Sequence, residues 1–140
     1  MSSPTKLALE LVTPDQALVH EAVDEVQLPG AEGYFGVLPG HTPLLALLGV
    51  GQMWYRRGAE KTFLAVAGGT AEVLPDRVIV LSQTAERAED IDVMRAEAAK
   101  KHAEALLTKS ARVEDVDRAR IALLRAISRL NTATRARTRG

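Results

Sequence analysis

Two sets of residues in the C-terminal half have the types and spacing of a nucleotide site. The hexapeptide Ile91-Asp92-Val93-Met94-Arg95-Ala96 places a carboxylate and a guanidinium three positions apart at the start of a predicted helix. Arg125 and Arg129 are four positions apart, so they share one face of a second predicted helix. Guanidinium groups bind phosphate oxygens in a forked geometry. If the two helices fold back antiparallel, one carboxylate and three guanidiniums converge into a plausible nucleotide cage.

Both sets also have an interpretation without a ligand. Acidic residues such as Asp90 and Asp92 cap free amide groups at the start of a helix and interact favourably with its dipole. Arg95 is then an ion-pair neighbour. Arg125 and Arg129 form a solvated basic face, where like charges repel slightly. Spacing alone leaves the two interpretations open.

The histidines favour neither a metal site nor a catalytic one. His20, His41 and His102 are widely separated and lack spacing such as H-E-x-x-H. His41 lies in the stretch GYFGVLPGHTPL (residues 33–44), where Pro39 and Gly40 predict a turn. We therefore expect His41 to supply hydrogen bonds or a surface contact. An enzyme that uses His41 with Glu32 is the alternative, but no nucleophile-elbow motif accompanies it.

Gly68-Gly69-Thr70 is the remaining glycine motif. It matches neither the phosphate loop G-x-x-x-x-G-K-[ST] nor the dinucleotide pattern G-x-G-x-x-G. We predict a turn between two strands at this position.

The overall composition excludes several classes of protein. With 140 residues, the chain is long enough for one ordinary domain or two small units. Its 18 basic and 18 acidic residues balance, so no bulk charge indicates a nucleic-acid partner. Without cysteine, disulfides and cysteine metal sites are excluded. No signal peptide is expected at the start, and no apolar run approaches the ~20 residues of a spanning helix, so no direct membrane insertion is expected.

The chain divides into two halves of different composition. All six prolines, all five aromatic residues and nine of the ten glycines lie at or before Pro75. Residues 1–88 carry 6 basic and 10 acidic residues, whereas residues 89–140 carry 12 and 8. The halves therefore have opposite net charges, which is a weak indication that they pack together.

The first half reads as short strands separated by turns, and the second as helix. Leu7, Leu9 and Leu11 recur at alternate positions, and the Val23, Val26, Leu28 pattern has one irregularity that suggests a bulge. From Asp90 the chain is rich in alanine and has no proline, which predicts helices over 92–107 and about 113–135. The fold predicted is an N-terminal antiparallel β-sandwich (1–88) followed by a C-terminal antiparallel two-helix hairpin (89–140). The expected strands are 6–12, 16–20, 21–28, 34–38, 51–57, 61–67, 70–74 and 77–81.

Three segments in order resemble the epsilon subunit of bacterial F-type ATP synthase. They are EVQLPGAEGYFGVLPGHTPLLALLGVG (25–51), AVAGGTAEVLPDRVIVLSQTAERAEDID (65–92) and the alanine-rich hairpin. PGHTPLL and AGGTAEV are specific in combination. The resemblance implies a non-catalytic subunit of the central rotor stalk, at the cytoplasmic face of the cell membrane. Its sandwich would bind the gamma subunit and the c-ring. Its hairpin would inhibit ATP hydrolysis when extended toward the alpha and beta subunits.

The resemblance also implies two sets of site residues. Some members bind ATP as a regulatory ligand, not an obligatory cofactor, through an I/L-D-x-x-R-A motif on the folded hairpin. The implied ATP-binding residues are Glu86, Ile91, Asp92, Arg95, Ala96, Arg125 and Arg129. Glu32, Gly33 and His41 match the end of the sandwich that meets the c-ring. A free-standing nucleotide-sensing adaptor is the alternative function.

Overall fold

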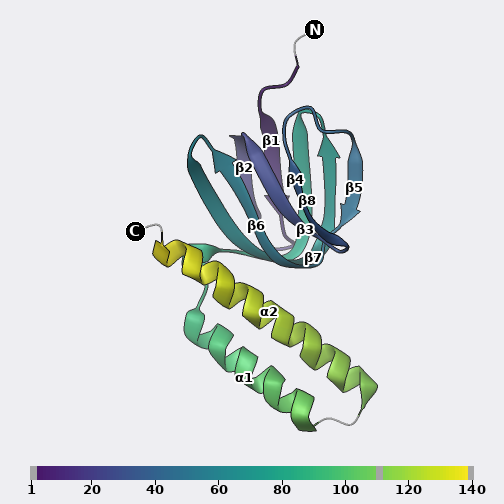
Figure 1. The fold of residues 1–140 in the computed structure, drawn as a ribbon, viewed down its shortest axis with the longest axis vertical. Coiled ribbons are helices and arrows are strands. Elements are labelled where there is room, and N and C mark those ends of the chain that lie inside the picture. Colours follow the sequence, from purple (N-terminus) through teal and green to yellow (C-terminus); the bar gives the residue numbers. More distant parts are fainter. Residues whose placement is uncertain (1–2, 110–111, 139–140) are drawn as a thin grey trace.

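The chain folds into a β-sandwich with a helical hairpin at one end (Figure 1). The computed structural model describes residues 3–109 and 112–138. The strands are β1 (Leu7–Val12), β2 (Ala17–Val23), β3 (Glu25–Gly30), β4 (Gly33–Val37), β5 (Leu44–Leu47), β6 (Val50–Arg57), β7 (Glu60–Leu74) and β8 (Arg77–Arg87). A short 3-10 helix, η1 (Ala88–Asp90), leads to the helices α1 (Val93–Lys109) and α2 (Val113–Thr138).

The strands form one continuous hydrogen-bonded path in the order β2-β1-β8-β7-β6-β3-β4, with β5 added beside β7. The pairs along this path are antiparallel except for β1 with β8, which run parallel. The predicted fold class is confirmed, with this parallel pair as a departure from a purely antiparallel sandwich. The core between the layers consists of large aliphatic side chains, including Leu9, Leu28 and Leu64, none of which is exposed.

β7 is a single bent strand, so the turn predicted at Gly68-Gly69-Thr70 is wrong. Its first half pairs with β6 and its second half with β5. At the bend, Gly68 and Gly69 have φ angles of +72° and +113°. A Cβ atom on Gly69 would lie 1.9 Å from the carbonyl oxygen of Leu81. Only glycine allows this close approach, and the bend lets one strand serve both layers.

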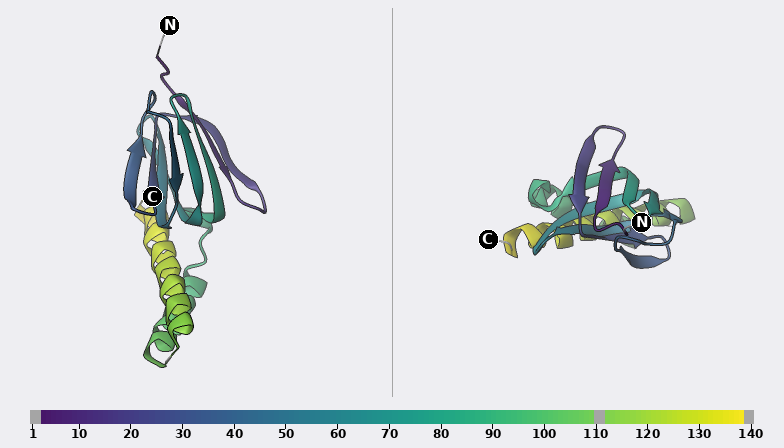
Figure 2. Two further views of the ribbon diagram at one scale, coloured as in Figure 1. Left: turned by 90° about the vertical axis from the view of Figure 1, so that its right-hand side faces the viewer. Right: turned by 90° about the horizontal axis from the view of Figure 1, so that it is seen from above.

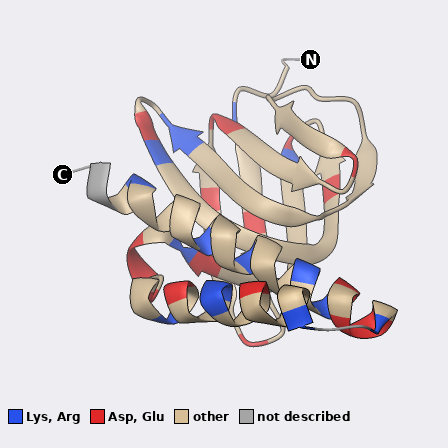
Figure 3. Ribbon diagram, turned by 60° about the horizontal axis from the view of Figure 1, so that its bottom comes forward, with Lys and Arg blue, Asp and Glu red and all other residues tan. Residues whose placement is uncertain are grey.

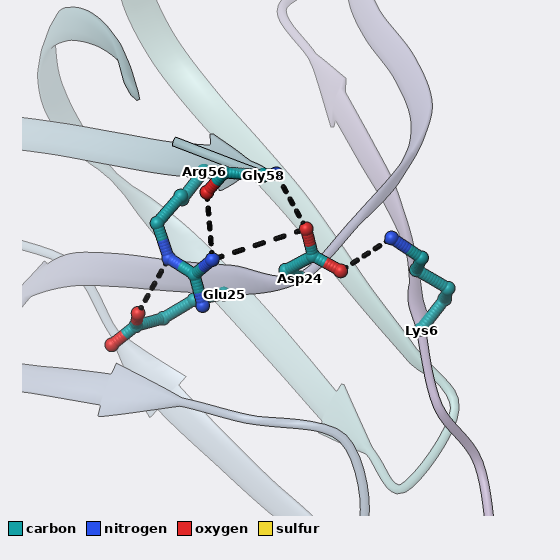
Figure 4. Close-up of polar contacts among 5 residues, drawn as sticks. All are labelled: Lys6, Asp24, Glu25, Arg56 and Gly58. Carbon is teal, nitrogen blue, oxygen red and sulfur yellow. Dashed lines mark hydrogen bonds and ion pairs between the residues drawn. The ribbon is translucent and has the colours of Figure 1, made fainter. Parts of the chain in front are cut away.

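The irregularity predicted as a bulge near Val23 is instead a corner between β2 and β3 at Asp24. The carboxylate of Asp24 accepts hydrogen bonds from Lys6 Nζ and, at 2.6 Å, from the Gly58 amide (Figure 4). Arg56 approaches the same carboxylate at 3.9 Å and donates from Nε to Glu25 at 3.1 Å. The hydrogen bonds from Lys6 and Gly58 hold the pKa of Asp24 below its ordinary value. This cluster joins the start of β1 to the β2–β3 corner and the β6–β7 turn.

The hairpin packs against the end of the sandwich that lies opposite the start of β1 (Figure 2). Both helices are confirmed within two to three residues of the predicted bounds. The predicted connection, residues 108–112, lies partly outside the described residues. The buried apolar side chains of α1 and α2 are small and recur at seven-residue intervals: Ala96 and Ala103 on α1, and Ala119, Ala126 and Ala133 on α2. Neither helix is long and apolar enough, over its described residues, to cross a membrane.

Candidate nucleotide site and docking surface

A cavity of about 320 Å³ lies where the hairpin meets the sandwich. β6, β7 and β8 supply one wall, and α1 and α2 supply the other. The lining is mostly aliphatic with a few polar groups: Val50, Ala65, Val66, Ala67, Thr84, Glu86, Ala99, Ala122, Arg125, Ala126, Ser128 and Arg129. An apolar pocket with a few converging polar groups is the usual form of a small-molecule site, and this volume is at the lower end of the usual range.

Three of the predicted ATP-binding residues meet in this cavity. Arg129 donates two parallel hydrogen bonds to the Glu86 carboxylate, from Nε to Oε1 at 2.6 Å and from Nη2 to Oε2 at 3.1 Å. Arg125, one turn earlier on α2, is exposed and also lines the cavity. Because the charges of Glu86 and Arg129 offset each other, Arg125 leaves the cavity with one positive charge in excess. That charge favours an anionic ligand.

Asp92 and Arg95 do not join this group. Asp92 lies directly before α1, and its carboxylate accepts a hydrogen bond from the Arg95 amide at 3.1 Å. This contact is a helix cap, as expected from the interpretation of the motif without a ligand. Both side chains are exposed, and neither lines the cavity. The predicted convergence of one carboxylate with three guanidiniums is therefore absent in the described residues, where Glu86 stands in place of Asp92.

The two apolar residues of the motif are packing residues in this structure. Ile91 is 8% exposed and clusters with Ala65 on β7 and Ala133 on α2. Ala96 is fully buried. The motif thus begins α1 and holds it beside the cavity, one turn away from the lining residue Ala99.

Sequence reasoning missed the two hydroxyl groups of the cavity. Thr84 on β8 and Ser128 on α2 both line it. The buried Ser128 hydroxyl oxygen has no hydrogen-bond partner among residues 3–109 and 112–138. The position of Ser128 between Arg125 and Arg129, on the same part of the helix, was the available signal. Thr84 carries no comparable signal in the sequence.

Arg87 anchors the strand end from which the hairpin departs. It donates to the carbonyl oxygen of Leu18 at 2.7 Å and lies 3.5 Å from the Tyr55 hydroxyl. The interaction with Tyr55 raises the pKa of Arg87, although burial opposes that shift. Glu86 precedes this anchor directly, so its backbone belongs to the sandwich.

The three predicted c-ring residues lie at the two ends of β4. Glu32 and Gly33 line a groove with β5 at the β3–β4 turn. His41 lies beyond the other end, in a groove that includes Leu38, and its Nδ1 is 2.6 Å from the Thr42 carbonyl oxygen. β4 ends the sheet path, and most of its residues are exposed. A surface containing all three residues must therefore run along β4.

The described residues contain no group of three or more His, Asp or Glu side chains that could hold a metal ion. Figure 3 shows Lys and Arg segments mixed with Asp and Glu segments along α1, whereas on α2 the acidic segments lie in the first turns and basic segments follow. The hairpin as a whole therefore carries both signs of charge, with its acidic residues on α1 and at the start of α2.

Both parts of the chain match known families. Residues 6–88 match the family described as ATP synthase, Delta/Epsilon chain, beta-sandwich domain. Residues 89–134 match the family described as ATP synthase, Delta/Epsilon chain, long alpha-helix domain. The two matches follow each other directly and cover nearly the whole chain.

Individual relatives agree with these matches. The ATP synthase epsilon chain of Solibacter usitatus is 49% identical over 130 residues, covering 93% of this chain and 97% of its own. That of Syntrophobacter fumaroxidans is 48% identical over 128 residues, covering 91% and 96%. A chain of the Euglena gracilis mitochondrial ATP synthase OSCP/F1/c-ring structure superimposes with a TM-score of 0.82 at 26% identity, covering 91% of this chain and 81% of that one. The chain therefore belongs to the epsilon subunit family of F-type ATP synthase.

Proposed function

We propose that this chain is a non-catalytic rotor subunit that couples the gamma subunit to the c-ring of a proton-translocating ATP synthase. Membership of the epsilon family supports the assignment, as does the likeness to a chain of an assembly that contains F1 and a c-ring. The complex would lie at the cytoplasmic face of the cell membrane, with this subunit peripheral to it.

The hairpin is the regulatory part of this proposal. Folded on the sandwich it permits ATP hydrolysis, and extended toward the alpha and beta subunits it inhibits. A segment can switch in this way only if its two states lie within a few kcal/mol of each other. The small buried side chains of the hairpin support such a balance. Deleting residues 89–140 should preserve assembly and raise hydrolysis by the purified complex; unchanged hydrolysis would contradict the inhibitory role.

The cavity is the proposed ATP site. The observation that carries this assignment is the meeting of Glu86, Arg125 and Arg129 in one apolar cavity between sandwich and hairpin. Ile91, Asp92, Arg95 and Ala96 support the site by starting α1 beside it. Because ATP would contact both parts of the chain, it would favour the folded state by its differential affinity.

Calorimetric titration of the full chain with ATP tests the site. We expect Arg125→Ala to weaken binding at least tenfold, because Arg125 carries the excess positive charge. Arg120→Ala is the matched control, since Arg120 is also an exposed arginine of α2 but does not line the cavity. Equal ATP affinity in the two variants would refute the assignment.

Docking to the c-ring is proposed along β4, from Glu32 and Gly33 to His41. This strand ends the sheet, and its exposed face leaves room for a partner. His41→Ala should weaken assembly with the c-ring, whereas His20→Ala on β2 serves as the control histidine. If both variants assemble equally well, the His41 end of this surface is not used.

A further inference from the structure

The contact between hairpin and sandwich is concentrated in a short part of α2. The Gln52 side-chain amide donates to the Thr132 hydroxyl at 3.4 Å, and the Arg135 guanidinium lies 5.0 Å from the centre of the Phe63 ring. The α2 side chains in these two contacts, in the Glu86 ion pair and in the apolar cluster with Ala65 lie within two turns: Arg129, Thr132, Ala133 and Arg135.

Glu86 and Arg129 form the strongest directional contact in this set. Two parallel hydrogen bonds join a planar guanidinium to a carboxylate, the geometry in which charge-assisted bonds are strongest. The Arg129 and Glu86 side chains are only 26% and 36% exposed, so solvent screens them less than it screens a fully exposed pair. One partner belongs to the sandwich and the other to the hairpin, so the bond breaks whenever the hairpin leaves.

The remaining contacts are weaker individually. The apolar cluster at this interface has Ala65, Ile91 and Ala133 as its buried members among the described residues. Two of these side chains are single methyl groups, which remove little apolar area from water. The Gln52–Thr132 hydrogen bond is long at 3.4 Å. Among these contacts, the two-bond ion pair is therefore the strongest directional link between hairpin and sandwich.

We propose that the Glu86–Arg129 pair is a latch that holds the hairpin folded when the cavity is empty. The latch rests on the proposed function only in assuming that the hairpin detaches; it does not require ATP binding. It also separates the roles of the two cavity arginines. Arg129 is already engaged by Glu86, whereas Arg125 makes no ion pair with residues 3–109 or 112–138 and is available to an anionic ligand.

Thiol labelling without nucleotide measures the latch directly. The sequence has no cysteine, so Ala65→Cys introduces a single thiol beneath the hairpin, at a position that is 5% exposed. A bulky maleimide can reach this thiol only when the hairpin opens, and the labelling rate then reports the open population. In this background Glu86→Gln should raise the rate about fivefold, because it removes one charge of the pair with little change of shape.

Two further variants make the result specific. Asp24→Asn weakens an ion pair within the sandwich, so it should leave the labelling rate unchanged unless labelling proceeds through unfolding of the sandwich. The double exchange of Glu86→Arg with Arg129→Glu should return the rate toward that of the starting chain. Equal labelling rates with and without Glu86→Gln, or no labelling in either chain, would overturn the latch. Loss of ATP binding in Arg125→Ala, measured separately, would leave this conclusion unaffected.

Discussion

The sandwich and the hairpin bury different kinds of side chain. The sandwich core of the described residues is mostly Leu and Val, many of them with no exposed surface. In α1 and α2 the buried apolar side chains are all alanine among the residues whose side chains are described. Burial of a leucine contributes about 1.5–3 kcal/mol, whereas a single methyl group contributes about 0.8 kcal/mol. One chain thus combines a strongly held unit with a weakly held one.

This difference suits the two proposed roles. A component that transmits torque needs a core that resists deformation, and close-packed aliphatic layers supply it. A switch needs two states of similar free energy, which large buried side chains would prevent. The alanines at seven-residue intervals allow close helix packing while keeping the buried area small.

The largest effect is expected in the sandwich, from Leu64→Ala. Leu64 is fully buried on β7 and pairs with Met53 on β6. Its truncation should lower the free energy of unfolding by about 2–5 kcal/mol, through lost transfer energy and the cavity left behind. Denaturant titration followed by the fluorescence of Trp54, the only tryptophan, measures this change.

Leu124→Ala is the matched control on α2. Leu124 is 51% exposed, so the same truncation should change the free energy of unfolding by less than about 0.5 kcal/mol. Comparable losses in the two variants would show that the hairpin is held as strongly as the sandwich, and the contrast between them would fail.

A smaller effect is expected from placing a larger side chain between the two helices of the hairpin. Ala119 on α2 is 2% exposed, and a leucine there would force the helices apart. We expect Ala119→Leu to destabilise the hairpin by about 1–3 kcal/mol and to leave the sandwich intact. Helical circular dichroism during thermal unfolding follows the hairpin, while Trp54 fluorescence follows the sandwich. Ala105→Leu, at an exposed position of α1, should have little effect. Similar losses of hairpin stability from Ala119→Leu and Ala105→Leu would argue against close packing between the two helices.

The two-part fold was predictable because composition changes sharply near residue 89, but long-range pairing was not. The parallel partnership of β1 and β8 joins residues about seventy positions apart, and no local pattern encodes it. β5 was not predicted because Leu44, Leu45 and Leu47 show no alternation and are exposed. The end of β8, from Ser82 to Arg87, was missed because polar residues interrupt its pattern.

Site prediction met a similar limit. Spacing correctly placed Arg125 and Arg129 on one helix face, and the resemblance added Glu86. Which carboxylate meets Arg129 depends on where α2 docks on the sandwich, and that is a tertiary property. Asp92 has the right chemistry, but its local hydrogen bond to the Arg95 amide keeps it at the helix start.

The smallest effect is expected at the Asp24 cluster, where an ion pair supports a core that is already strong. Hydrogen bonds from Lys6 and Gly58 lower the pKa of Asp24 from its ordinary value of 3.8 in the folded chain. A lowered pKa stabilises the fold above pH 3.8, and this contribution is lost as the pH falls through the folded-state pKa. The original chain should therefore be modestly more stable than Asp24→Asn at neutral pH, and the difference should disappear in strong acid.

Denaturant titrations of the original chain and of Asp24→Asn, from neutral pH to strong acid, measure the difference in the free energy of unfolding. Asp15→Asn is the control, because Asp15 is exposed and makes no ion pair with the described residues. A stability difference between the original chain and Asp24→Asn that does not change with pH would remove the electrostatic explanation for this cluster.

Asp24→Asn, combined with the thiol at Ala65→Cys, sharpens the contrast between the Asp24 ion pair and the Glu86–Arg129 ion pair. Loss of the Asp24 pair should affect only the sandwich, because its partners Lys6 and Gly58 both lie there. Loss of the Glu86 pair should release the hairpin without destabilising the core, because its partner Arg129 lies on α2 and not in the sandwich. A hairpin released by Asp24→Asn, at a pH where the sandwich stays folded, would show that the two parts are not separately held.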